Sequence, residues 1–167
     1  MTKAKLLNTA LLLLPLCLHS VAEAKETKIE NQGKCLAIAL YYEARGESER
    51  GQKAVADVII QRSLDKGMSV CRVLTIPNQF SWRAALMWRP YPKDSLTQQK
   101  VAYKIMDDVA HKKWKSSVNG ATYFHSGKKP KWAKRLIFIK KIDGHYFYKE
   151  KRRWRRNKGS HMTTRTI

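Results

Sequence analysis

The first amphipathic segment of the chain covers residues 34–45. Leu36, Leu40 and Glu43 fall on one face at helical spacing, which predicts a helix over these residues. Gly46 follows directly and suits the left-handed position that often ends a helix. Since carboxylates are rarely buried, Glu43 on an otherwise apolar face is the first candidate for chemistry.

Further helices are predicted over residues 49–65, 70–74 and 95–114. Ser48 precedes the first of these as an N-cap, and Gly67 follows it. The sequence Ser95-Leu-Thr-Gln98 has the form of a capping box, in which the fourth residue returns a hydrogen bond to the first. Between these helices, residues 75–92 are irregular and rich in Trp, Phe and Pro.

The pattern changes after Asn119-Gly120, where β-branched and aromatic residues become frequent. They predict strands over residues 121–125, 136–141 and 145–149. Asp143-Gly144, between the last two strands, is a typical hairpin turn. The predicted fold class is therefore α+β: a helical body followed by a small antiparallel sheet, in a chain of 167 residues that suits one domain.

The first 24 residues have the layout of a secretory signal peptide. A basic start precedes an apolar stretch, and Ala22-Glu-Ala24 supplies the small residues of a cleavage site. Two alternatives stay open: an uncleaved membrane anchor and a lipoprotein acylated at Cys17. With cleavage, we expect a periplasmic or secreted protein in which residues 25–33 form a polar linker.

The chain is strongly basic, with 34 Lys+Arg against 13 Asp+Glu and a net charge of +21. Such a charge favours an anionic partner: nucleic acid, an acidic membrane or an acidic polymer. Because an exported protein does not normally meet chromosomal DNA, we expect no nucleic-acid partner but an anionic wall polymer or membrane surface. The basic tail, residues 149–167, is the segment expected to contact that surface, and a solvated arm is the alternative.

Two cysteines, Cys35 and Cys71, remain after removal of the signal peptide. In an oxidising compartment two leftover thiols are typical of one disulfide, and a pair of buried reduced thiols is the alternative. We expect no metal site, since the sequence has no His-Glu-x-x-His and no Cys/His pair at ligand spacing. We also expect no cofactor.

The position of Glu43 in the last turn of its predicted helix favours the neutral acid. The negative end of the helix and the surrounding apolar residues both disfavour the carboxylate, which raises the pKa. An acid that stays protonated near neutral pH is suited to general acid catalysis. A structural salt bridge from Glu43 to Arg45 or Arg62 is the alternative.

Several short segments occur in a fixed order along residues 34–148. The most specific is Glu43-Ala-Arg-Gly-Glu47, and the others are Cys71-Arg-Val, Gln79-Phe-Ser-Trp82, Gly120-Ala-Thr-Tyr-Phe-His125, Pro130-Lys-Trp132 and Gly144-His-Tyr-Phe-Tyr148. Together they resemble the cell-wall hydrolase family of the spore-cortex-lytic enzymes. One departure is Gln61, where that family usually has Asn.

The resemblance implies a lysozyme-like, lytic-transglycosylase-like catalytic domain over residues 34–148. It also implies cleavage of the β-1,4 bond between N-acetylmuramic acid and N-acetylglucosamine in peptidoglycan, with Glu43 as the catalytic residue. A lytic transglycosylase needs no second carboxylate, because the muramic acid C6 hydroxyl attacks its own C1. Glu43 would protonate the leaving oxygen and then accept the hydroxyl proton, which gives a 1,6-anhydro sugar. Glu47 is a further candidate for the substrate site, with a salt bridge to an arginine as the alternative.

The substrate groove is expected to use aromatic and amide side chains, because sugars stack on rings and present hydroxyl and acetamide groups to polar atoms. The irregular segment and the predicted sheet, where such residues are displayed, supply the candidates Gln79, Phe80, Trp82, Tyr123, His125 and His145. For Phe80 and Trp82 the alternative is packing in the core, and for His145 it is a surface or core position in the sheet. A position outside the groove also stays open for Tyr123 and His125.

Two classes of function follow from these features. The first is an exported, monomeric peptidoglycan glycosidase that acts in wall remodelling, spore germination or, as an endolysin, phage lysis. The alternative is a non-catalytic basic protein that binds an anionic wall polymer, a membrane or nucleic acid.

Overall fold

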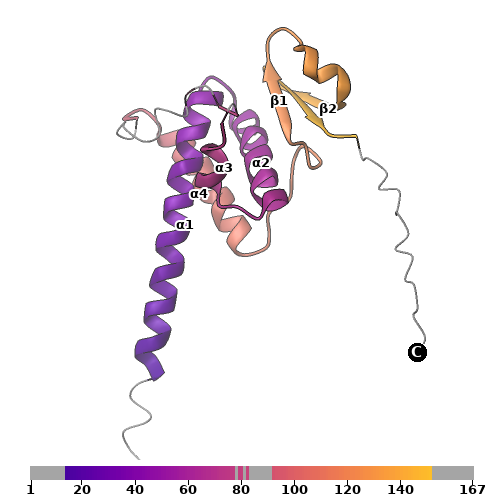
Figure 1. Cartoon of the computed structure of the whole chain (residues 1–167). Coiled ribbons are helices and arrows are strands. Elements are labelled where there is room, and N and C mark those ends of the chain that lie inside the picture. Colours follow the sequence, from indigo (N-terminus) through magenta and orange to yellow (C-terminus); the bar gives the residue numbers. More distant parts are fainter. Residues whose placement is uncertain (1–13, 78, 81, 83–91, 152–167) are drawn as a thin grey trace, which may run out of the picture.

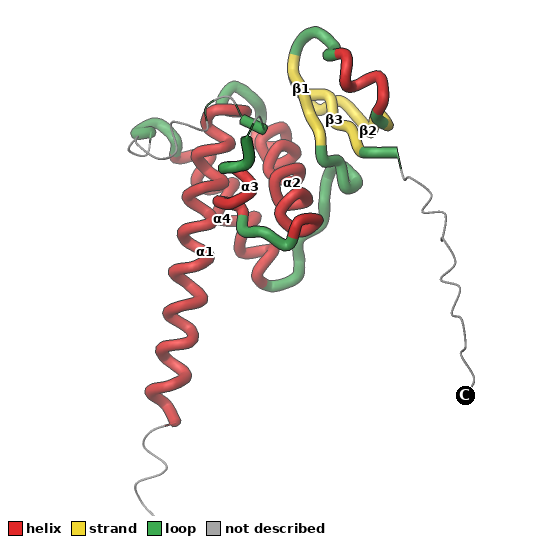
Figure 2. The backbone as a smooth tube through the Cα atoms, in the orientation of Figure 1, coloured by secondary structure: helices red, strands yellow, loops and turns green. Residues whose placement is uncertain are grey.

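The computed structural model describes residues 14–77, 79–80, 82 and 92–151, and side chains from residue 28 onward. Within these residues, helices come first and a small sheet follows, in separate parts of the molecule (Figures 1 and 2). The helices are α1 (Leu14–Ala44), α2 (Glu49–Lys66), α3 (Val70–Leu74) and α4 (Leu96–Ala110). The strands are β1 (Tyr123–Ser126), β2 (Ile137–Ile142) and β3 (His145–Lys149), and a 3₁₀ helix (Lys131–Arg135) joins β1 to β2. The α+β prediction is confirmed.

Helix α1 begins well before the predicted start, so residues 25–33 are helical and the linker prediction is wrong for their local structure. The end of this segment packs against the helical body. The Gln32 side chain accepts a hydrogen bond from the Val70 amide (3.1 Å). Gly33 lies so close to Tyr103 of α4 that a Cβ there would be 2.5 Å from the ring. The signal peptide stays a prediction, and within the described residues no helix has the length and apolar content to cross a membrane.

The hydrophobic core lies between α1, α2 and α4. The predicted ends of α2 are confirmed: the Ser48 side chain accepts from the Gly51 amide (3.2 Å), and Gly67 closes the helix with a left-handed φ of 60°. The apolar stripe predicted for α4 is also confirmed, because its inward residues Val101, Ala102, Ile105 and Met106 are buried.

Two predicted details of α4 are wrong. The Ser95 side chain makes no cap hydrogen bond, and Gln98 is buried and donates to Gln52 Oε1 of α2 (3.2 Å) instead of returning to Ser95. The helix also ends before Trp114, because Lys112 takes a left-handed φ of 58° that an α-helix does not accept.

A disulfide joins Cys35 of α1 to Cys71 of α3, with Cα atoms 5.3 Å apart, as predicted. The bond closes a loop with a sequence separation of 36 residues. In the chain-entropy account, a loop of this size adds about 3–4 kcal/mol to the free energy of unfolding. The disulfide therefore secures the segment of α1 that leads to Glu43.

The sheet is antiparallel, with strand order β1-β3-β2. Its β2–β3 hairpin turns at Asp143-Gly144, as predicted, and docks on the start of α2. Asp143 Oδ2 accepts hydrogen bonds from the Ser48 amide (3.1 Å) and the Ser48 hydroxyl (2.5 Å). The Gly144 amide donates to Glu47 Oε2 (3.0 Å). These bonds hold the hairpin beside the end of α1.

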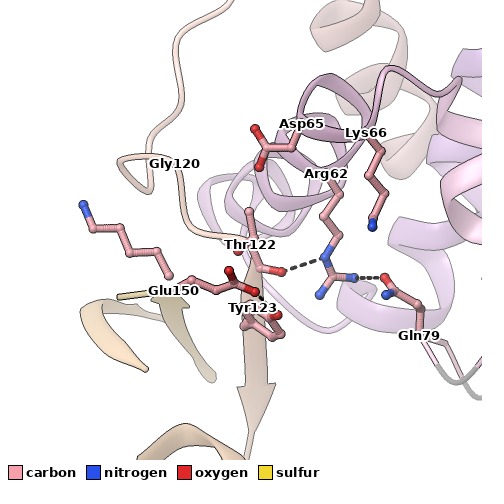
Figure 3. A pocket seen from close by; sticks show the side chains of 9 residues that line it. Arg62, Asp65, Lys66, Gln79, Gly120, Thr122, Tyr123 and Glu150 are labelled. Atoms are coloured by element: carbon pink, nitrogen blue, oxygen red, sulfur yellow. Dashed lines mark hydrogen bonds between the residues drawn. The ribbon is translucent and has the colours of Figure 1, made fainter. Parts of the chain in front are cut away.

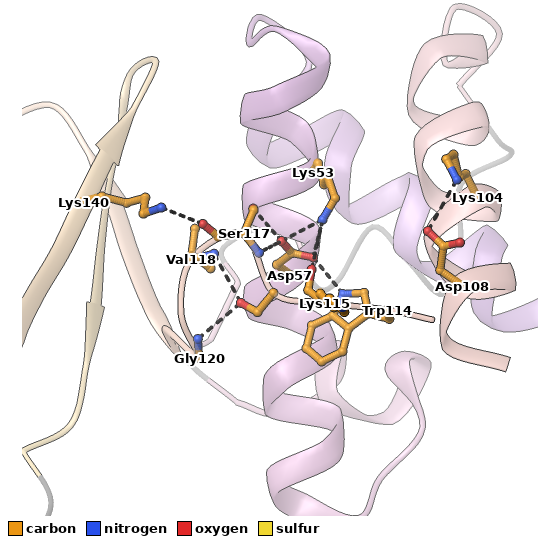
Figure 4. A network of polar contacts seen from close by, with 11 residues as sticks. Lys53, Asp57, Lys104, Asp108, Trp114, Lys115, Ser117, Val118, Gly120 and Lys140 are labelled. Atoms are coloured by element: carbon orange, nitrogen blue, oxygen red, sulfur yellow. Dashed lines mark hydrogen bonds and ion pairs between the residues drawn. The ribbon is translucent and has the colours of Figure 1, made fainter. Parts of the chain in front are cut away.

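A second anchor between the helices and the sheet is the fully buried Asp57 of α2 (Figure 4). Its carboxylate accepts from Trp114 Nε1 (2.8 Å) and from the Ser117 amide (2.7 Å) and hydroxyl (2.6 Å). Lys53 pairs with it at 3.1 Å. Since Trp114 and Ser117 lie between α4 and β1, Asp57 holds the start of the sheet against α2.

Candidate active site

Glu43 lies in the last turn of α1, partly buried, where the hairpin and α2 meet. The indole Nε1 of Trp82 donates a 2.6 Å hydrogen bond to Glu43 Oε1. The Trp82 ring also stacks on Tyr42, the residue before Glu43, with centroids 5.2 Å apart and planes inclined by 16°. Trp82 therefore orients the carboxyl group of Glu43 through its ring N–H while its flat face packs on Tyr42.

The surroundings of Glu43 favour the protonated acid. Burial raises the pKa of the carboxyl group, while the Trp82 hydrogen bond and the positive charges of His145 and Arg62 partly oppose the increase. The predicted direction is confirmed. Among the described residues, no ion pair joins Glu43 to either arginine of the alternative interpretation. Arg45 lies over the Tyr41 ring instead, 5.1 Å from its centroid.

Arg62 of α2 lies among polar and aromatic side chains from several segments of the chain (Figure 3). Its Nε donates to the Thr122 carbonyl (2.6 Å) and its Nη1 to Gln79 Oε1 (3.1 Å). The guanidinium group also lies over Phe80 and Tyr123, 5.6 Å and 5.9 Å from the ring centroids. Burial lowers the pKa of Arg62, but a guanidinium group keeps its charge in proteins. Arg62 thus places a fixed positive charge near Glu43.

A pocket of about 410 Å³ opens beside Arg62, lined by Arg62, Asp65, Lys66, Gln79, Gly120, Thr122, Tyr123, Lys149 and Glu150 (Figure 3). The Tyr123 hydroxyl donates to Glu150 Oε1 (2.7 Å), and this bond raises the pKa of Tyr123. The pocket has both charged and apolar walls. Its size and its few directed polar groups are typical of a site for a small polar ligand or a polymer segment.

Glu47 faces the hairpin and not an arginine. Its Oε2 accepts from the Gly144 amide, and its Oε1 lies 3.2 Å from His145 Nδ1. The Nδ1 atom is buried, but its alignment with the carboxylate is too poor for a hydrogen bond, so the contact is one of charge when His145 is protonated. Glu47 and His145 therefore join the hairpin to the turn after Glu43.

The structure brings most of the predicted groove residues together. Trp82 contacts Glu43, and the residues Gln79, Phe80 and Tyr123 surround Arg62. Phe80 is part of the core, as its alternative interpretation expected, and its role in a groove stays a prediction. His145 is buried between Glu47 and the aromatic core, whereas His125 lies on the far side of the sheet, where its Nε2 is 3.1 Å from the Tyr148 hydroxyl.

Two residues of this site are absent from the set that the sequence predicts. Arg62 enters the sequence interpretation only as a salt-bridge partner, although a charged residue on the apolar stripe of α2 is a signal for a special role. Tyr42 gives no signal, since its stacking on Trp82 depends on tertiary structure. In the part of the chain described here, no group of His, Cys, Asp and Glu side chains is arranged to hold a metal ion.

This chain is similar to known proteins in sequence and in fold. Residues 46–148 match the family described as Cell Wall Hydrolase. The catalytic domain of the Bacillus cereus SleB protein is 29% identical with a TM-score of 0.58, over 72% of this chain and 91% of that one. The catalytic domain of the germination-specific lytic transglycosylase SleB from Bacillus anthracis is 30% identical with a TM-score of 0.58, over 71% and 94%. No curated protein matches the chain.

Proposed function

Because the chain belongs to the cell wall hydrolase family, we propose that it is a lytic transglycosylase in which Glu43 alone serves as acid and base. The family and the lysozyme-like α+β fold make the chain a peptidoglycan glycosidase. The proposal adds the identity of the acid and the product, a 1,6-anhydro-N-acetylmuramic acid end. One of the similar structures is named a lytic transglycosylase, which supports this choice of product.

The observation that carries the proposal is the raised pKa of a carboxyl group oriented by Trp82. In the first step the Glu43 proton moves to the glycosidic oxygen as the bond from this oxygen to C1 breaks. In the second, the C6 hydroxyl of the same sugar attacks C1 and gives its proton to the Glu43 carboxylate. The acid is regenerated, and no water is consumed.

Arg62 and the Trp82 indole stabilise the Glu43 carboxylate that exists between the two steps. Both lower the pKa of Glu43 against the larger effect of burial, so they stabilise the carboxylate left by the first proton transfer. Preorganised donors of this kind cost no reorganisation at the moment of reaction. We infer that the sugar beside Glu43 packs on the Trp82 ring, and that Gln79 and Tyr123 extend the groove along the Arg62 pocket.

Two other acidic residues, Glu47 in the turn after Glu43 and Asp57 of α2, are committed to structure, and this supports a single-carboxylate mechanism. Glu47 accepts from the hairpin amide and faces His145. Asp57 is fully buried, and both of its oxygens are occupied by Trp114, Ser117 and Lys53. A hydrolase would need a carboxylate free to activate water or to attack the sugar.

We further propose that the protein acts outside the cytoplasm. A disulfide and a signal-like N-terminus are typical of exported proteins, and a net charge of +21 attracts the enzyme to an anionic wall. Residues 152–167 of the predicted basic tail lie outside the described residues, so the role of the tail in this attraction stays a prediction. The monomeric state is likewise an expectation.

The test is digestion of purified peptidoglycan by wild type and by Glu43→Gln. The amide keeps the shape of the side chain but has no acidic proton, so release of soluble fragments should fall to background. Glu30→Gln is the matched control, because Glu30 lies on the same helix in an exposed ion pair with Lys34. Digestion by Glu43→Gln at the wild-type rate would exclude Glu43 as the acid.

A further inference from the structure

The face of the sheet that points away from the helices carries a cluster of aromatic rings. Side chains alternate across a strand, so Phe124 and Phe147 pack on the core while His125 and Tyr146 project from the opposite face. The His125 ring stacks on Tyr146, with centroids 5.1 Å apart and planes inclined by 10°. It also stacks on Tyr148, at 5.5 Å and 20°.

A pocket of about 320 Å³ opens on this face, lined by His125, Gly127, Lys129, Phe138, Tyr146 and Tyr148, and we refer to it as the outer aromatic pocket. Phe138 is its most exposed ring, with 52% of its surface open to solvent. Its edge contact with Tyr148, at 5.5 Å, holds it at the rim. A large exposed ring beside a concave surface is typical of a binding site.

A row of rings leads from the active site to the outer aromatic pocket. Tyr123 lines the pocket beside Arg62, and its ring lies 5.9 Å from Trp132. Trp132 in turn makes edge contacts with His125 (5.7 Å) and Tyr148 (5.9 Å). Trp132 therefore links Tyr123 of the Arg62 pocket to two rings of the outer aromatic pocket.

Among the described residues, the lining of the outer aromatic pocket contains one charged side chain, Lys129, which is positive. No Asp or Glu occurs between Asp108 and Asp143. Lys129 lines the pocket, and Lys141 Nζ lies 5.1 Å from the centroid of the Tyr146 ring. The same stretch also contains Lys128, Lys131, Lys134 and Arg135. Such a surface attracts a ligand that carries both an apolar face and negative charge.

We propose that the outer aromatic pocket is a second, non-catalytic site for the wall polymer. An amino sugar would pack the apolar face of its ring on Phe138 and Tyr146, and a carboxylate of the same polymer would face Lys129. The polymer's identity rests on the proposed function, since the catalytic groove next to this pocket acts on peptidoglycan. Rings combined with lysines match a glycan that bears carboxylates better than they match a purely phosphate-rich partner, for which lysines alone would suffice.

The consequence is that the enzyme holds the insoluble wall at two places. Binding at the outer aromatic pocket keeps the protein on the polymer while the catalytic groove is empty, which raises the effective concentration of cleavable bonds. The pocket should therefore contribute to binding of whole sacculi independently of Glu43.

The experiment measures binding of the full chain to purified peptidoglycan sacculi, with Glu43→Gln as the parent so that the polymer stays intact. Phe138→Ala in this parent should weaken binding about tenfold, equivalent to about 1.4 kcal/mol. Phe138→Tyr should bind as the parent does, because it keeps the ring. Leu64→Ala is the matched control: Leu64 is 54% exposed, lies on α2 and should bind as the parent does.

Equal binding by Phe138→Ala and Leu64→Ala would overturn the proposal. If Phe138→Ala lowers the melting temperature, Lys129→Met replaces it, and weaker binding with a smaller dependence on salt than the parent shows is expected. Binding to anionic vesicles and to duplex DNA is measured in parallel. If Phe138→Ala weakens binding to either of these but not to sacculi, the proposal is also overturned. If binding to sacculi depends on Phe138 but the wild type releases no anhydro products, the second site is supported and the proposed function is wrong.

Discussion

The indole of Trp82 donates to the Glu43 carboxylate at 2.6 Å while its ring stacks on Tyr42. The donor stabilises the ionised form of Glu43, and burial stabilises the neutral form more strongly. The two effects hold one carboxyl group in a state from which it can first give and then accept a proton. This balance is the basis of the single-residue mechanism.

Trp82→Phe should shift the alkaline limb of the pH–activity profile to higher pH. Phenylalanine keeps an aromatic ring on Tyr42 but removes the donor that lowers the pKa of Glu43, so the acid stays protonated to higher pH. The measurement is the pH dependence of kcat/KM on solubilised glycan. Trp114→Phe, which removes a similar donor from Asp57, should leave this limb in place. A limb that moves to lower pH would contradict the role of Trp82.

Glu43→Gln should stabilise the protein at neutral and alkaline pH. Because the pKa of Glu43 in the folded state lies above its ordinary value of 4.5, ionisation disfavours folding. The wild type therefore loses stability as pH rises from the ordinary pKa to the folded pKa, whereas the glutamine variant does not. Urea unfolding between about pH 4 and about pH 8 measures the difference. The gap should widen with pH, and a gap that narrows would mean that the carboxylate is favoured in the folded state.

Gly51→Ala should destabilise the protein despite the better helix propensity of alanine. A Cβ at this helical position would collide with the Asp143 carboxylate that anchors the hairpin, and it would lie 2.9 Å from Glu47 Cβ. We expect a loss of about 1–3 kcal/mol in the free energy of unfolding. Gly46→Ala is the control and should be near neutral. Gly46 does not take the left-handed φ expected from the sequence, and a Cβ there would meet nothing within 4 Å. Equal effects of the two substitutions would argue against hairpin docking at Gly51.

Reduction of the Cys35–Cys71 disulfide should lower the melting temperature by about 10 °C, from its loop size and the usual entropy of unfolding for a chain of this length. Thermal unfolding with and without a phosphine reductant gives the shift. The variant Cys35→Ser should have the lower melting temperature without reductant, and the reductant should not change it further. An unchanged melting temperature of the reduced wild type would show that the bond adds little.

The sequence is informative where local physics decides the structure. The Ser48 cap, the Gly67 termination and the Asp143-Gly144 turn each depend on residues close together in the chain. Glu43 can be identified from the sequence because burying a carboxylate on an apolar helix face costs free energy, so such a residue is a candidate for a functional role. The family resemblance then connects that residue to a substrate.

The remainder depends on contacts between segments far apart in the chain. Residues 25–33 look polar, but Gln32 caps α3 and Gly33 receives the Tyr103 ring, so the segment continues α1. Gln98 has the sequence of a capping residue, yet a buried partner in α2 takes its hydrogen bond. The central place of Arg62 becomes visible only once Thr122 and Gln79, remote in sequence, lie beside it.

The central claim is that Glu43 alone drives an intramolecular cleavage. The most direct test is mass spectrometry of muropeptides released from purified peptidoglycan by wild type and by Glu43→Gln. We expect 1,6-anhydro-muropeptides from the wild type and no released fragments from the variant. Reducing-end products from the wild type would contradict the claim, because they require water as the nucleophile and a second group to activate it.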